Sequence, residues 1–153
     1  MNYRTLGKTG MRISEIGFGG WAIGKSSWVG AEDNESLRAL NLAVDRGLNF
    51  IDTAMGYGDG HSETLVGQLV KSRSERIYIA TKLSPINKKW PAVRGSHVND
   101  GFTARHIIAC TEARAVSSPK CKKCSMMLLK VERIRCKQLS GALEAERFAR
   151  PSV

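Results

Sequence analysis

The chain has 153 residues, of which 42% are hydrophobic and 25% are charged, and its formal net charge is +10. This composition excludes a globally disordered chain and a collagen-like chain, and the length favours a single domain. No apolar run approaches the ~18 residues of a membrane span, and the N-terminus lacks the pattern of a signal peptide, so we expect a cytoplasmic protein.

The N-terminal segment predicts a β-hairpin followed by a short strand. Residues 3–6 and 11–14 form the two arms of the hairpin. The glycines of the GKTG sequence between them bracket the turn, because left-handed backbone angles cost glycine little. Residues 16–19 then predict a short apolar strand that runs into Gly20 and Trp21.

An amphipathic helix and a buried strand are predicted next. Asp33 or Asn34 can cap the start of the helix, which runs to about Arg46, and Gly47 is a good residue to end it. Residues 48–52 predict a buried strand that ends in the carboxylate of Asp52. The apolar face of the helix repeats at helical spacing, at Leu37, Leu40 and Val44.

The same order of strand and helix repeats after a glycine-rich loop at residues 53–60. Ser62 can cap a second helix, and residues 77–81 predict a third apolar strand that ends at Lys82. A long loop over residues 84–101 leads to a third helix, which Thr103 can cap. The apolar stripe of the second helix consists of Leu65, Val66, Leu69 and Val70.

The alternation of apolar strands with amphipathic helices predicts an α/β fold with a parallel sheet and right-handed crossovers. The polar residues gather just past the strand ends, at Gly20 and Trp21, at residues 52–57 and at Lys82. In such folds this edge of the sheet is where ligands bind.

Three of these strand-end residues suggest acid catalysis. A tyrosine such as Tyr57 has an ordinary pKa near ~10, and a lysine ammonium beside a phenol lowers that pKa. Lys82 can supply the ammonium, and Asp52 can hold it in place and keep it charged. Such a phenol can protonate a carbonyl oxygen while a hydride arrives at carbon, a contribution typically worth ~100- to 10,000-fold.

Several motifs together resemble the aldo-keto reductase family over about residues 2–112. They are the NFIDTAMGYG sequence at residues 49–58, IATK at 79–82, GKTG at 7–10, GFGGW at 17–21 and HSE at 61–63. The resemblance implies a (β/α)8 barrel closed at its bottom by an N-terminal hairpin, of which this chain holds the hairpin and about three βα units. It also implies hydride transfer between NADPH and an aldehyde or ketone.

By the same resemblance, Tyr57 is the proton donor, Lys82 is its partner and Asp52 orients Lys82. Gly20 and Trp21 lie against the nicotinamide side of the cofactor, and Asp52 lies near its ribose. No metal is implied. The carbonyl substrate is a small molecule whose identity the sequence does not give.

Two parts of the family pattern are missing. Members have a histidine at the end of the fourth strand. In this sequence His61 precedes a predicted helix, His97 lies in a predicted loop, and His106 lies inside the third predicted helix. A complete barrel takes ~250 residues, and its phosphate site is commonly built from the last two βα loops. We therefore expect a truncated reductase whose own activity is in question, and whose open strand edges favour self-association.

Residues 113–153 differ in composition from residues 1–112. They hold 10 basic and 3 acidic residues, against 14 basic and 11 acidic before them, and three of the four cysteines. We interpret them as a basic tail that is either frame-shifted or disordered. Cys121 and Cys124 have the spacing of a zinc knuckle, but with only Cys136 nearby a zinc site is not favoured.

An alternative function is a non-catalytic binding or regulatory remnant whose basic tail engages an acidic partner. Nucleic acid is not the favoured partner, because only Phe148 interrupts the charges of the tail and stacking recognition uses several aromatic residues. A membrane partner is likewise not favoured. NADPH binding distinguishes the reductase from this alternative.

Overall fold

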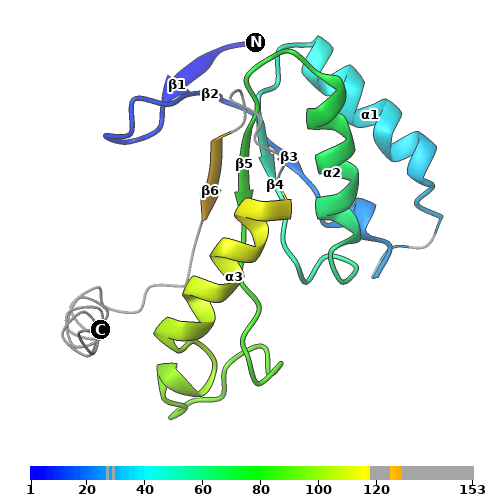
Figure 1. The fold of residues 1–153 in the computed structure, drawn as a ribbon. Coiled ribbons are helices and arrows are strands. Elements are labelled where there is room, and N and C mark those ends of the chain that lie inside the picture. Colours follow the sequence, from blue (N-terminus) through cyan, green and yellow to red (C-terminus); the bar gives the residue numbers. More distant parts are fainter. Residues whose placement is uncertain (27, 29, 118–124, 129–153) are drawn as a thin grey trace, which may run out of the picture. The chain divides into compact units, whose positions relative to one another are not determined.

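A computed structural model describes residues 1–26, 28, 30–117 and 125–128. The described chain forms a two-stranded hairpin, a four-stranded parallel sheet and helices (Figure 1), so the predicted α/β class is confirmed. Two compact units are distinguished along the chain. The first comprises residues 1–82 and a strand at 125–128, and the second comprises residues 83–117.

The hairpin consists of the antiparallel strands β1 (Tyr3–Thr5) and β2 (Arg12–Ser14). It is fixed to the rest of the first unit by the side chain of Asn49. This amide accepts a hydrogen bond from the Ser14 N–H at 2.7 Å and donates to the Arg12 carbonyl at 3.0 Å. Because Asn49 directly precedes a strand of the parallel sheet, the hairpin lies at the amino end of that sheet (Figure 1).

The parallel sheet has the strand order β3-β4-β5-β6. Gly19 is in register with Asp52, and Asp52 with Ala80, so three strands end at a common edge. Strand β3 is shorter than the strand predicted at residues 16–19. Ile16 lies outside it and is 65% exposed. The fourth strand was not predicted, and it pairs in parallel with the third. The strands are β3 (Phe18–Gly19), β4 (Phe50–Asp52), β5 (Tyr78–Thr81) and β6 (Ser125–Leu128).

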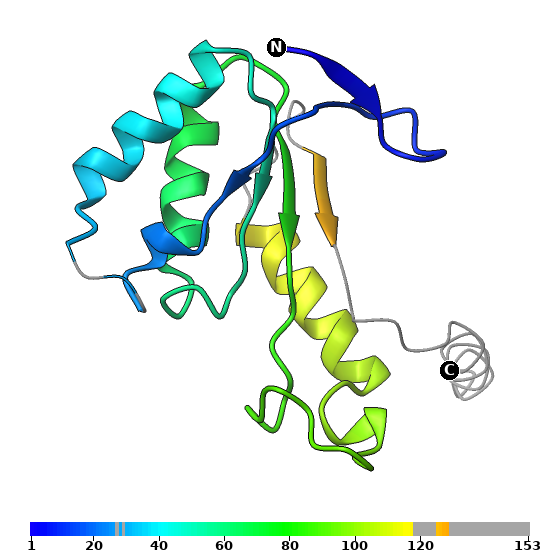
Figure 2. The same cartoon turned by 180° about the vertical axis from the view of Figure 1, so that it is seen from behind.

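Two helices, α1 (Asp33–Asp45) and α2 (His61–Ser72), lie side by side against the sheet in the first unit (Figures 1 and 2). Their predicted apolar faces are confirmed as core faces, with Val70 and Leu37 only partly buried. Full burial of one such side chain contributes roughly 1.5–3 kcal/mol. The central core residues are Leu40, Val44, Ile51, Leu65, Val66, Leu69, Ile77 and Ile79.

The helix starts differ from prediction, whereas the end of α1 does not. The residue before α1 is Glu32, which makes no side-chain cap, and Asp33 is already helical. The residue before α2 is Gly60 rather than Ser62, and its φ of 90° is one that glycine adopts readily. Gly47 ends α1 as predicted, with φ 89° and an N–H that donates to the Val44 carbonyl at 2.8 Å.

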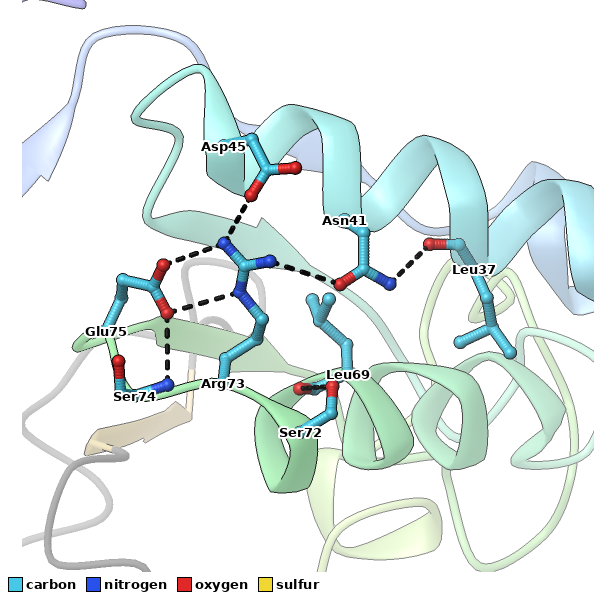
Figure 3. A network of polar contacts seen from close by, with 8 residues as sticks. All are labelled: Leu37, Asn41, Asp45, Leu69, Ser72, Arg73, Ser74 and Glu75. Carbon is cyan, nitrogen blue, oxygen red and sulfur yellow. Dashed lines mark hydrogen bonds and ion pairs between the residues drawn. The ribbon is translucent and has the colours of Figure 1, made fainter.

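Arg73, the residue that follows α2, joins the carboxyl ends of α1 and α2 (Figure 3). Its guanidinium donates to Asp45 at 2.5 Å, to Glu75 at 2.7 Å and to the Asn41 side chain at 3.4 Å. The hydrogen bonds to Asp45 and then Glu75 raise the pKa of Arg73. A planar fork of five donors suits this arrangement of acceptors better than an ammonium.

The second unit holds a loop, the 3₁₀-helix η2 (Val98–Asp100) and α3 (Ala104–Ser117). Thr103 caps α3 as predicted, since its hydroxyl accepts the His106 N–H at 3.2 Å. The helix runs to Ser117, past the change in composition after residue 112. In the portion of the chain that the structure describes, no helix has the length and apolar character to span a bilayer.

Candidate active site

Lys82, Asp52 and Tyr57 meet at the carboxyl edge of the sheet. The Lys82 ammonium donates to Asp52 Oδ2 at 2.6 Å, to the Tyr57 hydroxyl oxygen at 2.8 Å and to the Thr53 carbonyl at 3.2 Å. An ammonium has three hydrogens, so these three acceptors satisfy it completely. Asp52 ends β4, Lys82 follows β5 and Tyr57 lies in the intervening loop, which is the placement that the sequence predicts.

The electrostatics of this cluster favour a charged lysine. Partial burial alone disfavours the ammonium, but the hydrogen bonds to Asp52 and Tyr57 and the charge of Asp52 outweigh it. The net result is that the pKa of Lys82 is raised above its ordinary 10.5. The ammonium also lies 4.7 Å from the centroid of the Tyr57 ring, within the range of a cation–π contact.

The direction of the hydrogen bond between Lys82 and Tyr57 matters for chemistry. An ammonium has no acceptor, so the phenol oxygen must accept from Lys82. The hydroxyl hydrogen of Tyr57 is therefore not used in this contact. Tyr57 is half-buried, and the Lys82 ammonium lies at its hydroxyl oxygen. A phenol in this environment, with its hydrogen outside the lysine contact, is suited to donating a proton.

The loop that carries Tyr57 packs closely against the 3₁₀-helix η1 (Ala22–Gly24). A Cβ on Gly58 would lie 1.7 Å from the Gly24 carbonyl oxygen, and one on Gly24 would lie 2.6 Å from the Tyr57 carbonyl carbon. Neither position has room for a side chain. Gly58 also has a φ of 70°, which favours glycine. The two glycines thus let the backbone hold Tyr57 in place.

A polar network joins these same two loops. Asp33, at the start of α1, accepts from the Lys25 ammonium at 2.8 Å and contacts His61 Nε2 at 2.8 Å. Lys25 follows η1 directly, and His61 begins α2 after the Tyr57 loop. The hydrogen bond from Lys25 and then that from His61 lower the pKa of Asp33. The sequence alone predicts no contact among these three residues.

The predicted cofactor residues lie at the same edge. Gly20 is buried, and its N–H donates to the Asp52 carbonyl at 2.7 Å. A Cβ on Gly20 would lie 2.7 Å from the Ser62 hydroxyl, so only glycine fits there. Trp21 is 50% exposed, and its ring meets that of Trp28 edge-on with centroids 6.0 Å apart. The Asp52 side chain is also partly exposed, so both Trp21 and the Asp52 carboxylate are accessible.

All three histidines precede β6 in the sequence. His61 lies at the start of α2, and in the second unit His97 precedes η2 and His106 lies in α3. The predicted cysteine pair at residues 121 and 124 lies outside the described residues, as does most of the predicted basic tail.

The comparisons with known proteins agree with the motifs. Residues 15–115 match the sequence model of the aldo/keto reductase family. The chain is 40% identical over 84 residues to the aldo-keto reductase YhdN of Bacillus subtilis (strain 168), covering 54% of this chain and 25% of the relative. It is 32% identical over 117 residues to a probable voltage-gated potassium channel subunit beta of Arabidopsis thaliana, covering 74% and 32%.

Among solved structures, the chain resembles an aldo-keto reductase from Klebsiella pneumoniae in complex with NADPH. The TM-score is 0.52 at 25% identity, covering 88% of this chain and 41% of that chain. The matched structures are (β/α)8 barrels, so the predicted partial barrel is confirmed. The chain spans about a quarter to a third of the length of the curated relatives named above.

Proposed function

The chain belongs to the aldo/keto reductase family, and on that premise we propose that it acts in the NADPH-dependent reduction of an aldehyde or ketone. The observation that carries the proposal is the Lys82 ammonium, which contacts Asp52 and the Tyr57 hydroxyl at once. In this proposal Tyr57 is the proton donor, Lys82 stabilises the phenolate that remains, and Asp52 holds Lys82.

The residues at the strand ends fit one part of a nicotinamide cofactor. The half-exposed Trp21 indole can pack against a planar ring, and the accessible Asp52 carboxylate can accept a hydrogen bond from a ribose hydroxyl. Gly20 keeps this edge free of side-chain atoms. When bound, the cofactor would supply the hydride that reduces the carbonyl carbon.

The proton follows a route set by this chain's own residues. The carbonyl oxygen of the substrate accepts a hydrogen bond from the Tyr57 hydroxyl, whose hydrogen is not engaged with Lys82. As negative charge grows on that oxygen, the proton moves from the phenol to it. The Lys82 ammonium then lies 2.8 Å from the oxygen that has become anionic, and Asp52 keeps the ammonium in position.

Two measurements test this proposal. The first is a fluorescence titration of the full chain with NADPH at modest salt, which we expect to show saturable binding. The second is the carbonyl-dependent oxidation of NADPH with a panel of small aldehydes and ketones. A chain that binds no NADPH, and is retained on a polyanion column only at low salt, would contradict the proposal and favour the non-catalytic alternative.

A further inference from the structure

The first turn of α2 carries two side chains that bond to the ends of three strands. Ser62 is fully buried, and its hydroxyl donates to the Gly20 carbonyl at 2.7 Å and lies 2.9 Å from the Thr53 hydroxyl. Thr53 is 1% exposed and directly follows Asp52. The ends of β3 and β4 are thus joined to α2 through a buried and fully bonded pair of hydroxyls.

The neighbouring residue of α2 reaches the end of the third strand. The Thr81 hydroxyl donates to Glu63 Oε1 at 2.5 Å, and Thr81 is 1% exposed. A hydroxyl that donates to a carboxylate makes a charge-assisted hydrogen bond, which is shorter and stronger than one between neutral groups. Because Thr81 is the last residue of β5, this bond fixes the point from which Lys82 extends.

These contacts form a closed ring around the candidate active site. The Tyr57 carbonyl accepts the Ser62 N–H at 3.2 Å, which connects the Tyr57 loop to α2. Glu63 follows Ser62 and accepts from Thr81, which precedes Lys82. The Lys82 ammonium closes the ring on the Tyr57 hydroxyl. The first turn of α2 is therefore bonded both to the Tyr57 backbone and to Thr81, the residue before Lys82.

We propose that Glu63 and Thr81 are positioning residues that set the distance between Lys82 and Tyr57, a role that rests on the reductase function proposed above. Neither residue takes part in proton transfer itself. A displacement of about 1 Å in a catalytic group can cost ~100-fold in rate. The contact between Thr81 and Glu63 is placed to prevent such a displacement.

The test compares variants of Thr81. Thr81→Val keeps the branched shape and removes the donor, whereas Thr81→Ser keeps the donor. We expect Thr81→Val to lower kcat by about 10- to 100-fold, with the KM and the NADPH affinity little changed, and Thr81→Ser to recover most of kcat. Thr64→Val is the matched control, because the exposed Thr64 hydroxyl donates to the carbonyl of Gly60, the residue before α2, at 3.1 Å.

A second measurement does not depend on activity. The nuclear Overhauser effect between the Lys82 ε-methylene and the Tyr57 ring reports their proximity directly. We expect this effect to weaken or vanish in Thr81→Val and to persist in Thr81→Ser and Thr64→Val. If Thr81→Val does not fold, Glu63→Gln replaces it, because the amide keeps an acceptor oxygen without the charge. We expect Glu63→Gln to weaken the Overhauser effect in the same direction but by less.

The outcomes separate the two proposals. If the unmodified chain oxidises no NADPH with any carbonyl, the reductase function fails, while the Overhauser measurement still tests the positioning contact. If Thr81→Val keeps both kcat and the Overhauser effect, the positioning role is overturned. It is also overturned if Thr81→Ser is as impaired as Thr81→Val, because the hydroxyl would then not be the group that matters.

Discussion

The ammonium nitrogen of Lys82 lies 2.8 Å from the hydroxyl oxygen of Tyr57, although 25 positions separate the two residues in the chain. The contact exists because β4 and β5 are adjacent and parallel, so that both strands deliver their next residues to one edge. Asp52 completes the arrangement from the end of β4 at 2.6 Å. A phenol, an ammonium and a carboxylate thus share one small region of the first unit.

Replacing Tyr57 with phenylalanine removes the proposed proton donor and keeps the ring. We expect kcat for carbonyl reduction to fall by about 100- to 10,000-fold, which is the usual contribution of general acid catalysis. NADPH affinity should stay within about twofold, since the ring remains in place. Steady-state kinetics and a fluorescence titration measure the two quantities.

Tyr3→Phe is the control for that change, because Tyr3 lies in the hairpin, at the amino end of the sheet, and its hydroxyl donates to the carbonyl of Gly47 after α1. Its kcat should match that of the unmodified chain. Unchanged kcat in Tyr57→Phe would contradict the assignment of the proton donor.

Lys82→Met removes the ammonium that Asp52 and Tyr57 share. Because the pKa of Lys82 is raised above 10.5, the folded chain holds this proton more tightly than the unfolded chain does. The ammonium therefore stabilises the fold below about pH 10.5, and this contribution is lost as the pH rises through the folded pKa. We expect Lys82→Met to lose less stability than the unmodified chain between about pH 9 and about pH 12.

Urea unfolding at the two pH values measures that difference, and kcat of the same variant should fall strongly. Lys71→Met, in the last turn of α2, is the control for removal of an exposed ammonium. Equal alkaline losses for Lys82→Met and the unmodified chain would show that the ammonium at the site does not stabilise the fold.

Gly58→Ala tests the close approach of the Tyr57 loop to η1. The new Cβ would lie 1.7 Å from the Gly24 carbonyl oxygen, so the loop must move. Gly10→Ala is a matched control, because Gly10 has a φ of 73° against 70° for Gly58, but open space around its Cβ. The backbone strain common to both is of order 1 kcal/mol.

We expect Gly58→Ala to cost at least ~2 kcal/mol more than Gly10→Ala, as overpacking of a close contact does, and to lower kcat as well. Chemical unfolding and steady-state kinetics measure the two effects. Equal stabilities of the two variants would show that the loop has room for a side chain.

Asp33→Asn tests the link between Lys25 and His61. The hydrogen bonds from Lys25 and then His61 hold the pKa of Asp33 below its ordinary 3.8. The carboxylate therefore stabilises the fold above that ordinary value, and the contribution is lost as the pH falls through the lower folded pKa. We expect Asp33→Asn to show a smaller fall in stability between about pH 6 and about pH 3.

Asp59→Asn, an exposed position in the Tyr57 loop, controls for the removal of one carboxylate. Comparing the two variants separates the loss of the Asp33 contacts from the loss of one negative charge. If Asp33→Asn keeps the full acid sensitivity, the carboxylate has no preferred partner in the folded state.

The sequence predicts the positions of Asp52, Tyr57 and Lys82 well, because parallel strands end at one edge and the residues that follow them meet there. It predicts the core faces of α1 and α2 for a similar reason, since the spacing of apolar residues is a local property. The end of α1 at Gly47 is equally local.

The helix starts at α1 and α2 are where local reasoning fails. Asp and Ser are residue types that often cap helices. Here, however, the Asp33 side chain contacts Lys25 and His61, and the Ser62 hydroxyl donates to the Gly20 carbonyl. Each partner lies outside the helix concerned, so the local sequence around each helix start does not reveal it. Strand β6 was not predicted, because it lies within residues 113–153, whose excess of basic residues favours a tail rather than part of the sheet.

The anchoring of the hairpin through Asn49 has a consequence for how the molecule opens. Strands β1 and β2 are largely exposed, and hydrogen bonds through Asn49, the Ser14 hydroxyl and the Tyr3 hydroxyl attach them to the rest of the first unit. Such a ribbon is able to detach on its own while β4 and β5 stay paired. Its backbone amides should then exchange with deuterium well before those of the buried strands, and the tyrosine–lysine pair should survive that local unfolding intact.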